Sequence, residues 1–179
     1  MKTCLYVGSF DPITNSHLNI VLDLLKENKV DFVYFLPVNS KKQTTSITNR
    51  INMLNLVIKN NPKIKVLNIL NYTDDGFFNY KILEKLNLNI THILMGSDLF
   101  LKFNSFLNYQ DILNKYYLIV IKRNNFDLNN YVLTNYNNYL NKIIIINKEY
   151  LGSSTISRKE LVNLDKEVLA YIKENNLYN

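Results

Sequence analysis

Residues that suit phosphate binding follow an apolar run near the start of the sequence. The run Cys4–Val7 leads into Gly8-Ser9-Phe10-Asp11-Pro12, and Thr14 and His17 then open a helical pattern. A tight turn between a strand and a helix presents unpaired backbone N–H groups, and the helix dipole adds positive potential at the same place. Because Thr14 and His17 are three residues apart, both side chains can reach one phosphate from the same side.

A second stretch, far along the chain, has a similar design. Residues 143–146 are apolar, and Gly152-Ser153-Ser154-Thr155-Ile156-Ser157-Arg158 then opens another helical pattern. Serine or threonine at the start of a helix satisfies its unpaired N–H groups. The guanidinium of Arg158 is suited to forked contacts with phosphate. Together the two stretches favour a phosphate site more strongly than either does alone.

Strand-like runs alternate with helical patterns along the chain. We expect strands at 3–7, 31–36, 63–70, 91–95, 116–122 and 143–146. Helices are expected at 17–28, 48–59, 79–86 and 109–115, and two more from about 155 and 165. This alternation predicts a Rossmann-like, doubly wound α/β fold with a mostly parallel sheet and helices on both faces, in one domain over residues 1–179.

Two finer expectations concern single elements. The first helix is expected to bury Leu18, Val21, Leu22 and Leu25. The segment 124–141, rich in Asn and Tyr, is expected to be a surface excursion between two strands.

The candidate residues all fall at strand ends. Gly96 and Asp98 follow the fourth predicted strand and Arg123 ends the fifth, while the two phosphate stretches follow the first and the sixth. In doubly wound sheets, ligands bind beyond the carboxyl ends of the strands, where the strand order reverses. One crevice can therefore hold all these residues. Asp98 suits a ribose hydroxyl or, alternatively, caps the following helix, and Gly96 lets a ligand approach the backbone.

The two phosphate stretches resemble the paired signatures of the nucleotidyltransferase superfamily. Gly8–His17 resembles its (His/Thr)-x-Gly-His motif, and Ser153–Arg158 resembles its Ser-Ser-Thr-x-x-Arg motif. Met95–Leu99, Val120–Arg123 and Val168–Tyr178 are similar to bacterial nicotinate-nucleotide adenylyltransferases. The resemblance implies that the 5′-phosphate of nicotinate or nicotinamide mononucleotide attacks the α-phosphorus of ATP. The implied products are deamido-NAD or NAD and pyrophosphate.

The resemblance also implies roles for residues. Catalysis is expected from His17, Thr14 and Arg158. ATP is expected to contact Gly8, Ser9, Phe10, His17, Gly96, Asp98, Arg123, Ser153, Ser154, Thr155 and Arg158. The pyridine mononucleotide is expected to contact Lys42, Asn79 and Phe106. Mg²⁺ is expected to accompany ATP on its phosphate oxygens, and no dedicated protein metal site is expected.

Departures from the family pattern leave pyridine specificity open. Ser16 stands where the family has Gly, and Phe106 stands where it has a Trp that stacks on the pyridine ring. Phe77-Phe78-Asn79 replaces a segment that helps to recognise the pyridine carboxylate or amide. Phosphopantetheine adenylyltransferase is an alternative, because its opening motif is very close to Gly8–His17. That family's later Arg-Gly-Leu-Arg stretch has no match here.

Composition restricts the class of protein. With 179 residues and 47% hydrophobic residues, the chain suits a globular domain with a substantial core. The single cysteine, Cys4, cannot form an internal disulfide. No apolar run reaches the roughly 18–20 residues of a membrane span, and no signal-peptide pattern is present, so we expect a cytoplasmic protein without a membrane partner.

The formal net charge of +6 raises a second alternative, a nucleic-acid-binding module. The lysines are scattered, and no basic stripe with interleaved aromatics is evident. We therefore expect ATP and a pyridine mononucleotide as partners and no nucleic acid. The oligomeric state is left open.

Overall fold

The fold is built on one parallel sheet. The computed structural model describes residues 1–41, 43–106, 108–123, 126–148, 150 and 154–178. Its strands are β1 Thr3–Gly8, β2 Phe32–Pro37, β3 Ile64–Val66, β4 His92–Gly96, β5 Tyr117–Ile121 and β6 Ile143–Ile146. They lie in the order β3-β2-β1-β4-β5-β6, and every pairing is parallel. The order reverses between β1 and β4, so the predicted Rossmann-like fold is confirmed.

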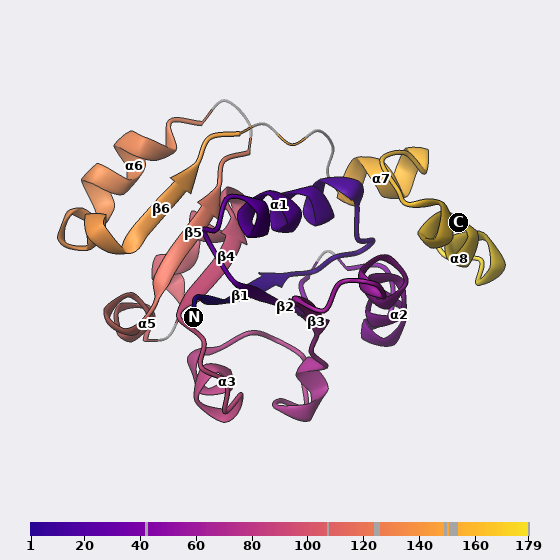
Figure 1. The fold of residues 1–179 in the computed structure, drawn as a ribbon, viewed down its shortest axis with the longest axis horizontal. Coiled ribbons are helices and arrows are strands. Elements are labelled where there is room, and N and C mark those ends of the chain that lie inside the picture. Colours follow the sequence, from indigo (N-terminus) through magenta and orange to yellow (C-terminus); the bar gives the residue numbers. More distant parts are fainter. Residues whose placement is uncertain (42, 107, 124–125, 149, 151–153, 179) are drawn as a thin grey trace.

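Helices cover both faces of this sheet, as Figure 1 shows for α1 and α3. The α-helices are α1 Asn15–Lys26, α2 Ile47–Ile58, α3 Tyr80–Lys85, α4 Ser97–Phe100, α5 Tyr109–Lys115, α6 Leu128–Asn135, α7 Ser154–Glu160 and α8 Lys166–Glu174. Short 3₁₀ helices are η1 Ile69–Asn71, η2 Phe103–Ser105 and η3 Asn137–Lys142. No helix in the described part of the chain is long and apolar enough to cross a membrane.

Two apolar cores result from the alternation of side chains along the strands. Tyr6 and Phe35 point to one face and pack with α1, α2 and α8. Val7 and Leu36, their chain neighbours, point to the other face and pack with α3, α4, α5 and α6. Successive residues of a strand face opposite sides, so strands buried on both faces must be apolar throughout. For this reason most of the strands could be recognised in the sequence as apolar segments.

Three local expectations were wrong or incomplete. The third strand ends at Val66, and the chain then turns into η1. Helix α1 buries Val21 as expected, but it also buries Ile20 and Leu24, whereas Leu22 is 40% exposed. The Asn/Tyr-rich segment lies between β5 and β6 as expected, but it contains α6 and η3, and Leu128, Val132 and Tyr136 bury their side chains in the core.

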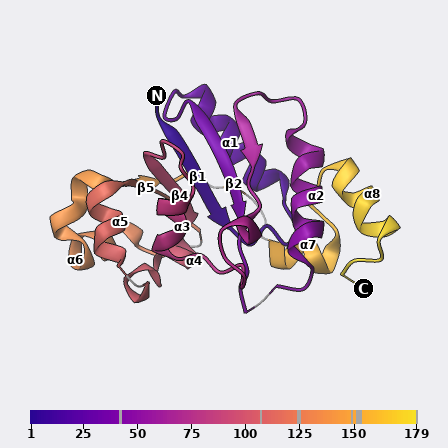
Figure 2. The same cartoon turned by 90° about the horizontal axis from the view of Figure 1, so that it is seen from below.

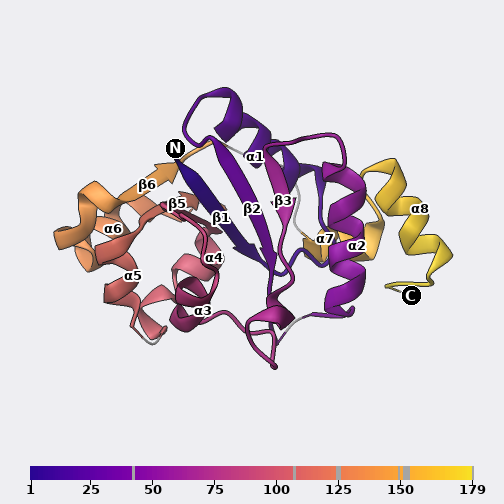
Figure 3. The same ribbon diagram turned by 60° about the horizontal axis from the view of Figure 1, so that its bottom comes forward.

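The strand ends form the base of the candidate site. Tyr6 is level with Leu94 across the β1–β4 pair, and Gly8 and Gly96 end these two strands two residues further on. Helix α7 lies beside this edge, near the ends of β1 and β2 (Figure 3). Helix α8 packs on α2, where Lys59 pairs with Glu167 at 2.7 Å (Figure 2). Residues from both ends of the sequence therefore meet at one edge of the sheet.

Candidate active site

The imidazole of His17 is fixed by the start of its own helix. Thr14 is the N-cap of α1, and the two residues form a capping box. The backbone N–H of Thr14 donates to Nδ1 of His17 at 3.2 Å, and the Thr14 hydroxyl lies 2.7 Å from the same nitrogen. A backbone N–H can only donate, so Nδ1 accepts and the proton of the neutral ring lies on Nε2. His17 therefore presents an N–H donor on its other side.

A second donor faces this N–H. Nη2 of Arg123, which follows β5, lies 3.4 Å from Nε2 of His17. Because both groups are hydrogen-bond donors, they cannot bond to each other, and both can donate to an acceptor that lies beside them. Arg123 is held by its backbone N–H, which donates to Oγ of Ser97 at 3.1 Å, and by an ion pair with Asp98 at 3.6 Å. The two donors lie near the ends of β1 and β4, at the switch point of the sheet, where their arrangement suits an anion.

The protonation state of His17 fits this arrangement. Burial and, to a smaller extent, the positive charge of the neighbouring Arg123 together lower the pKa of His17 to about 3. The ring is 6% exposed. At neutral pH the ring is therefore neutral and acts as a hydrogen-bond donor through Nε2, while the positive charge of the pair comes from Arg123.

Gly96 leaves room for this pair. A Cβ on Gly96 would lie 2.5 Å from Oδ1 of Asp98 and 3.1 Å from Nε of Arg123. The backbone of Gly96 has φ −77°, which any residue can adopt, so the requirement for glycine is one of space. Asp98 lies in the first turn of α4 and its side chain is 70% exposed. It is available to an external ligand while it pairs with Arg123.

The turn after β1 packs against the imidazole of His17 through Phe10. The Phe10 ring is 1% exposed and packs edge-on against His17, with 5.3 Å between ring centroids. It folds back over Gly8, where a Cβ would lie 2.9 Å from Cζ of Phe10. Phe10 has φ +47°, a left-handed backbone that is uncommon outside glycine and is often found at functional sites. The side chain of Phe10 therefore orients the imidazole, whereas its backbone lines the turn.

Helix α7 reaches the same turn. Oγ of Ser154 donates to the carbonyl of Pro12 at 3.0 Å. Nη1 of Arg158 donates to the carbonyl of Asp11 and lies 3.8 Å from its carboxylate, and Nη2 donates to Thr155 at 3.3 Å. Figure 1 shows α7 beside the N-terminal end of α1. The structure thus brings His17 and Arg158 to the same loop, with Arg158 resting on Asp11.

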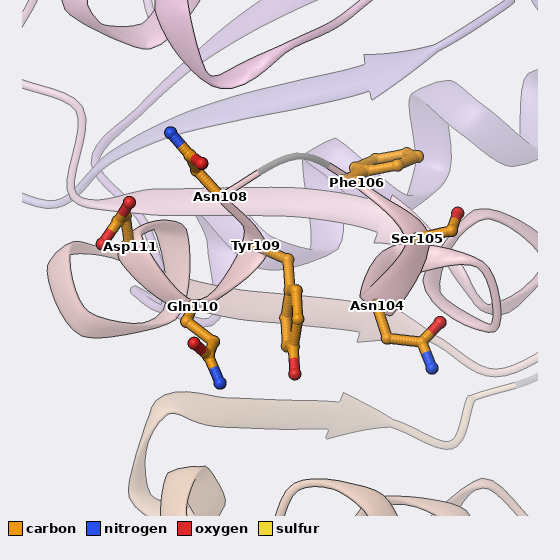
Figure 4. Close-up of a pocket in the computed structure, with 7 residues that line it drawn as sticks. All are labelled: Asn104, Ser105, Phe106, Asn108, Tyr109, Gln110 and Asp111. Atoms are coloured by element: carbon orange, nitrogen blue, oxygen red, sulfur yellow. The ribbon is translucent and has the colours of Figure 1, made fainter.

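The residues expected to bind the pyridine mononucleotide are partly described. Phe106 packs on Phe103 and Phe78, with ring centroids 5.7 Å and 6.3 Å apart. Asn79, next to Phe78, is the N-cap of α3 and its side chain makes no capping bond. In Figure 4, Phe106 and Tyr109 point in different directions around a surface depression lined by residues 104–106 and 108–111. Lys42 and Ser153 lie outside the described residues.

Sequence reasoning missed Arg50. Its side chain is 0% exposed, and its guanidinium donates to the carbonyls of Ser9 and Val38 at 2.8 Å and 2.7 Å and to Oδ1 of Asn39 at 2.7 Å. Arg50 therefore ties the ends of β1 and β2 together beneath the site. Its spacing was the available signal. Arg50 lies on the apolar face of α2, three residues before Met53, and an arginine at a buried position indicates that it has specific partners.

Comparisons with known proteins agree with this geometry. A family model described as cytidylyltransferase-like matches residues 5–160. A protein from Buchnera aphidicola named "Probable nicotinate-nucleotide adenylyltransferase" is 30% identical over 132 residues, which are 68% of this chain and 62% of that protein. A protein of the same name from Endomicrobium trichonymphae is 29% identical, over 99% of this chain and 98% of the relative.

A solved structure shares the fold. The nicotinic acid mononucleotide adenylyltransferase of Plasmodium falciparum, described as complexed with NaAD, superposes with a TM-score of 0.79 at 24% identity. The superposition covers 99% of this chain and 98% of that one. The resemblance drawn from the sequence motifs is confirmed by these relatives. The chain belongs to the cytidylyltransferase-like family.

Proposed function

We propose that this chain is a nicotinate-nucleotide adenylyltransferase, which transfers AMP from ATP to nicotinate mononucleotide and releases pyrophosphate. The observation that carries the proposal is the pair of donors on His17 and Arg123, 3.4 Å apart at the switch point of the sheet. The names of the relatives from Buchnera aphidicola and Endomicrobium trichonymphae support the same reaction. We propose one catalytic domain over residues 1–179, acting in the cytoplasm.

The proposed reaction needs alignment more than acid–base chemistry. An oxygen of the mononucleotide 5′-phosphate forms a bond to the α-phosphorus, and the bond from that phosphorus to the β-bridging oxygen breaks. The nucleophile is already an anion at neutral pH, so no protein base is required. Charge that moves onto the α-phosphate and onto pyrophosphate is stabilised by donors fixed in advance. In the proposal, the Nε2–H of His17 and the guanidinium of Arg123 are these donors.

We assign the other proposed ATP contacts to residues around this pair. Thr14 orients the imidazole, because its hydroxyl and its N–H both face Nδ1 of His17. The turn from Gly8 to Phe10 contributes its backbone, and Asp98 suits a ribose hydroxyl. Arg158, with Ser154 and Thr155 at the start of α7, is proposed to meet the β and γ phosphates.

Mg²⁺ enters the proposal as part of the ATP substrate. Among the described residues no group of three or more His, Cys, Asp and Glu side chains is arranged to hold a metal ion. Mg²⁺ keeps several waters and binds chiefly to phosphate oxygens, which fits a site whose own groups are donors. When bound with ATP, it would neutralise part of the charge on the phosphates.

The pyridine ring is proposed to pack near Phe106. Its neighbour Phe78 brings Asn79 to the same side of the sheet, and an amide side chain can hydrogen-bond to either a carboxylate or a carboxamide. We also propose that Lys42 binds the phosphate of the mononucleotide.

A substrate panel tests the proposal. The full chain is incubated with MgATP and, separately, with nicotinate mononucleotide, nicotinamide mononucleotide and phosphopantetheine, and pyrophosphate release is measured. The proposal predicts release with a pyridine mononucleotide and none with phosphopantetheine. Release with phosphopantetheine alone would assign the chain to the alternative adenylyltransferase. Tight RNA binding, with no pyrophosphate release from any substrate, would favour a nucleic-acid-binding module.

A further inference from the structure

The segment Ser154–Tyr178 holds the loop that carries the first phosphate motif. We call residues 9–14, between β1 and α1, the β1–α1 loop. Ser154 donates to Pro12 and Arg158 donates to Asp11, both in this loop. The backbone N–H of Asn15, at the start of α1, donates to the carbonyl of Asn163 at 2.9 Å. The loop therefore depends for its position on a segment about 140 residues later in the sequence.

A further contact between this segment and the loop is made through the buried carboxylate of Asp11. Asp11 is 0% exposed. Its Oδ2 accepts the backbone N–H of Thr44 at 2.6 Å, and its Oδ1 accepts the hydroxyl of Tyr178 at 2.7 Å. Arg158 lies 3.8 Å from Oδ2. Asp11 thus joins three parts of the chain: the β2–α2 connection, α7 and the stretch that follows α8.

Tyr178 is well suited to this contact. Burial and the bond to Asp11 both raise the pKa of its hydroxyl, which therefore remains protonated and can donate at any physiological pH. Without that donor, Oδ1 of Asp11 would be a buried anionic acceptor that lacks its partner. Loss of this hydrogen bond would favour a shift of the loop. Because the loop contains Thr14, the N-cap that orients His17, such a shift would change the orientation of the imidazole.

We propose that Tyr178 is a positioning residue for the nucleotide site: it acts through Asp11 to keep the β1–α1 loop in the arrangement that orients the Nε2–H donor of His17. The inference rests on the proposed function. Tyr178 lies beyond residue 160, where the match to the cytidylyltransferase-like family model ends, so the role belongs to a part of the chain that the model does not cover. Tyr178 touches no reacting atom in this account.

The chain offers a matched control. Tyr171, on α8 of the same segment, also donates its hydroxyl across to the rest of the protein. Its partner is Oδ1 of Asn49 on α2, at 2.9 Å, and Nδ2 of Asn52 on the same helix donates back to the Tyr171 hydroxyl at 2.9 Å. Tyr178→Phe and Tyr171→Phe therefore remove the same atom from the same segment, and only the first change reaches the β1–α1 loop.

The test compares the two variants in the full chain. We expect Tyr178→Phe to lower kcat with MgATP and nicotinate mononucleotide about tenfold or more, with the KM for nicotinate mononucleotide within twofold of the wild type. Hydrogen exchange measured by mass spectrometry is expected to quicken in peptides that cover residues 8–17. Tyr171→Phe is expected to keep kcat within twofold and to leave exchange in those peptides unchanged.

Three results would overturn the inference. The first is a Tyr178→Phe protein with wild-type kcat, and the second is an equal loss of kcat in Tyr171→Phe. The third is a Tyr178→Phe protein that no longer folds, as judged by its melting curve, since the contact would then serve the stability of the fold.

Failure of the proposed function is a separate outcome. If the wild type releases no pyrophosphate with any mononucleotide, the inference is judged by calorimetric binding of MgATP and by exchange in residues 8–17. Weaker MgATP binding and quicker exchange in Tyr178→Phe alone would support it. Equal behaviour of the two variants would refute it.

Discussion

The protonation of His17 links the candidate site to stability. Its imidazole is buried beside the guanidinium of Arg123, and its pKa lies at about 3, below the ordinary value of 6.5. The unfolded chain therefore takes up a proton on His17 as the pH falls through about 6.5, whereas the folded chain does not until about pH 3. The contribution of a neutral, buried His17 is fully present above pH 6.5 and is lost as the pH falls toward 3.

The size of the effect follows from the two pKa values. One unit of pKa difference corresponds to about 1.4 kcal/mol. Between pH 8 and pH 5, the wild type should lose about 2 kcal/mol of unfolding free energy through His17, and the full loss below pH 3 approaches about 5 kcal/mol. His92, whose pKa is also lowered by burial, adds a loss of the same sign. A variant that lacks only His17 separates the two contributions.

The assay is urea unfolding of the wild type and of His17→Gln at several pH values from 8 to 5. Glutamine does not titrate, so His17→Gln should lose about 2 kcal/mol less than the wild type over this range. The comparison uses the difference in slope, so a constant loss of packing in the variant does not affect it. Parallel stability curves for the two proteins would refute the reasoning, because His17 would then titrate at its ordinary pKa.

Further predictions address the elements around the pair. Gly96→Ala should lower kcat/KM for ATP about tenfold, because its Cβ clashes with Asp98 and crowds Arg123, while the urea midpoint changes little; an unchanged kcat/KM would show that the position of the Asp98–Arg123 pair does not matter. Arg50→Met should lower the free energy of unfolding by about 3 kcal/mol, since it leaves the carbonyls of Ser9 and Val38 without their hydrogen-bond donor. Urea unfolding at pH 8 measures this change, and a loss below about 1 kcal/mol would contradict the prediction. The thiol of Cys4 is buried, and burial raises its pKa, so it should react with a disulfide reagent only in urea; rapid reaction of the native protein would contradict its burial.

The sheet was predictable because most of its strand residues are apolar and buried. Only β3 is interrupted, by the exposed Lys65, and Gly8, Pro37 and Gly96 mark where three of the strands stop. The predicted alternation with helices then gave the parallel sheet and the edge at which ligands bind. The third strand was predicted too long, because apolar residues such as Ile69 are also buried when the chain turns into η1.

The face of α1 was mispredicted for a physical reason. The periodicity favoured Leu18, Val21, Leu22 and Leu25, and of these only Val21 is fully buried, because the His17 side of the helix faces the sheet. Ile20 and Leu24 then follow on the same face. His17, which packs on Tyr6 and Phe10, belongs to the buried face, and a count of apolar positions does not include a histidine.

That several candidate residues lie close together was predictable, whereas the contacts that pair them were less so. Strand ends and motifs placed His17, Arg123 and Asp98 at one edge, and the structure brings them together. The contact of Arg158 with Asp11 and the buried position of Arg50 depend on side-chain directions across segments far apart in the sequence. No local pattern encodes those directions, so they emerge only when the chain is folded.

The central claim is that the donors of His17 and Arg123 act on one phosphate of ATP. A double-mutant cycle of kcat/KM for ATP tests it, with His17→Ala, Arg123→Met and the double variant. Each single change should cost about a hundredfold, and the double variant should fall short of the product of the two losses by at least about tenfold. Losses that multiply in full would show that the two side chains act independently, and would contradict a shared anion site.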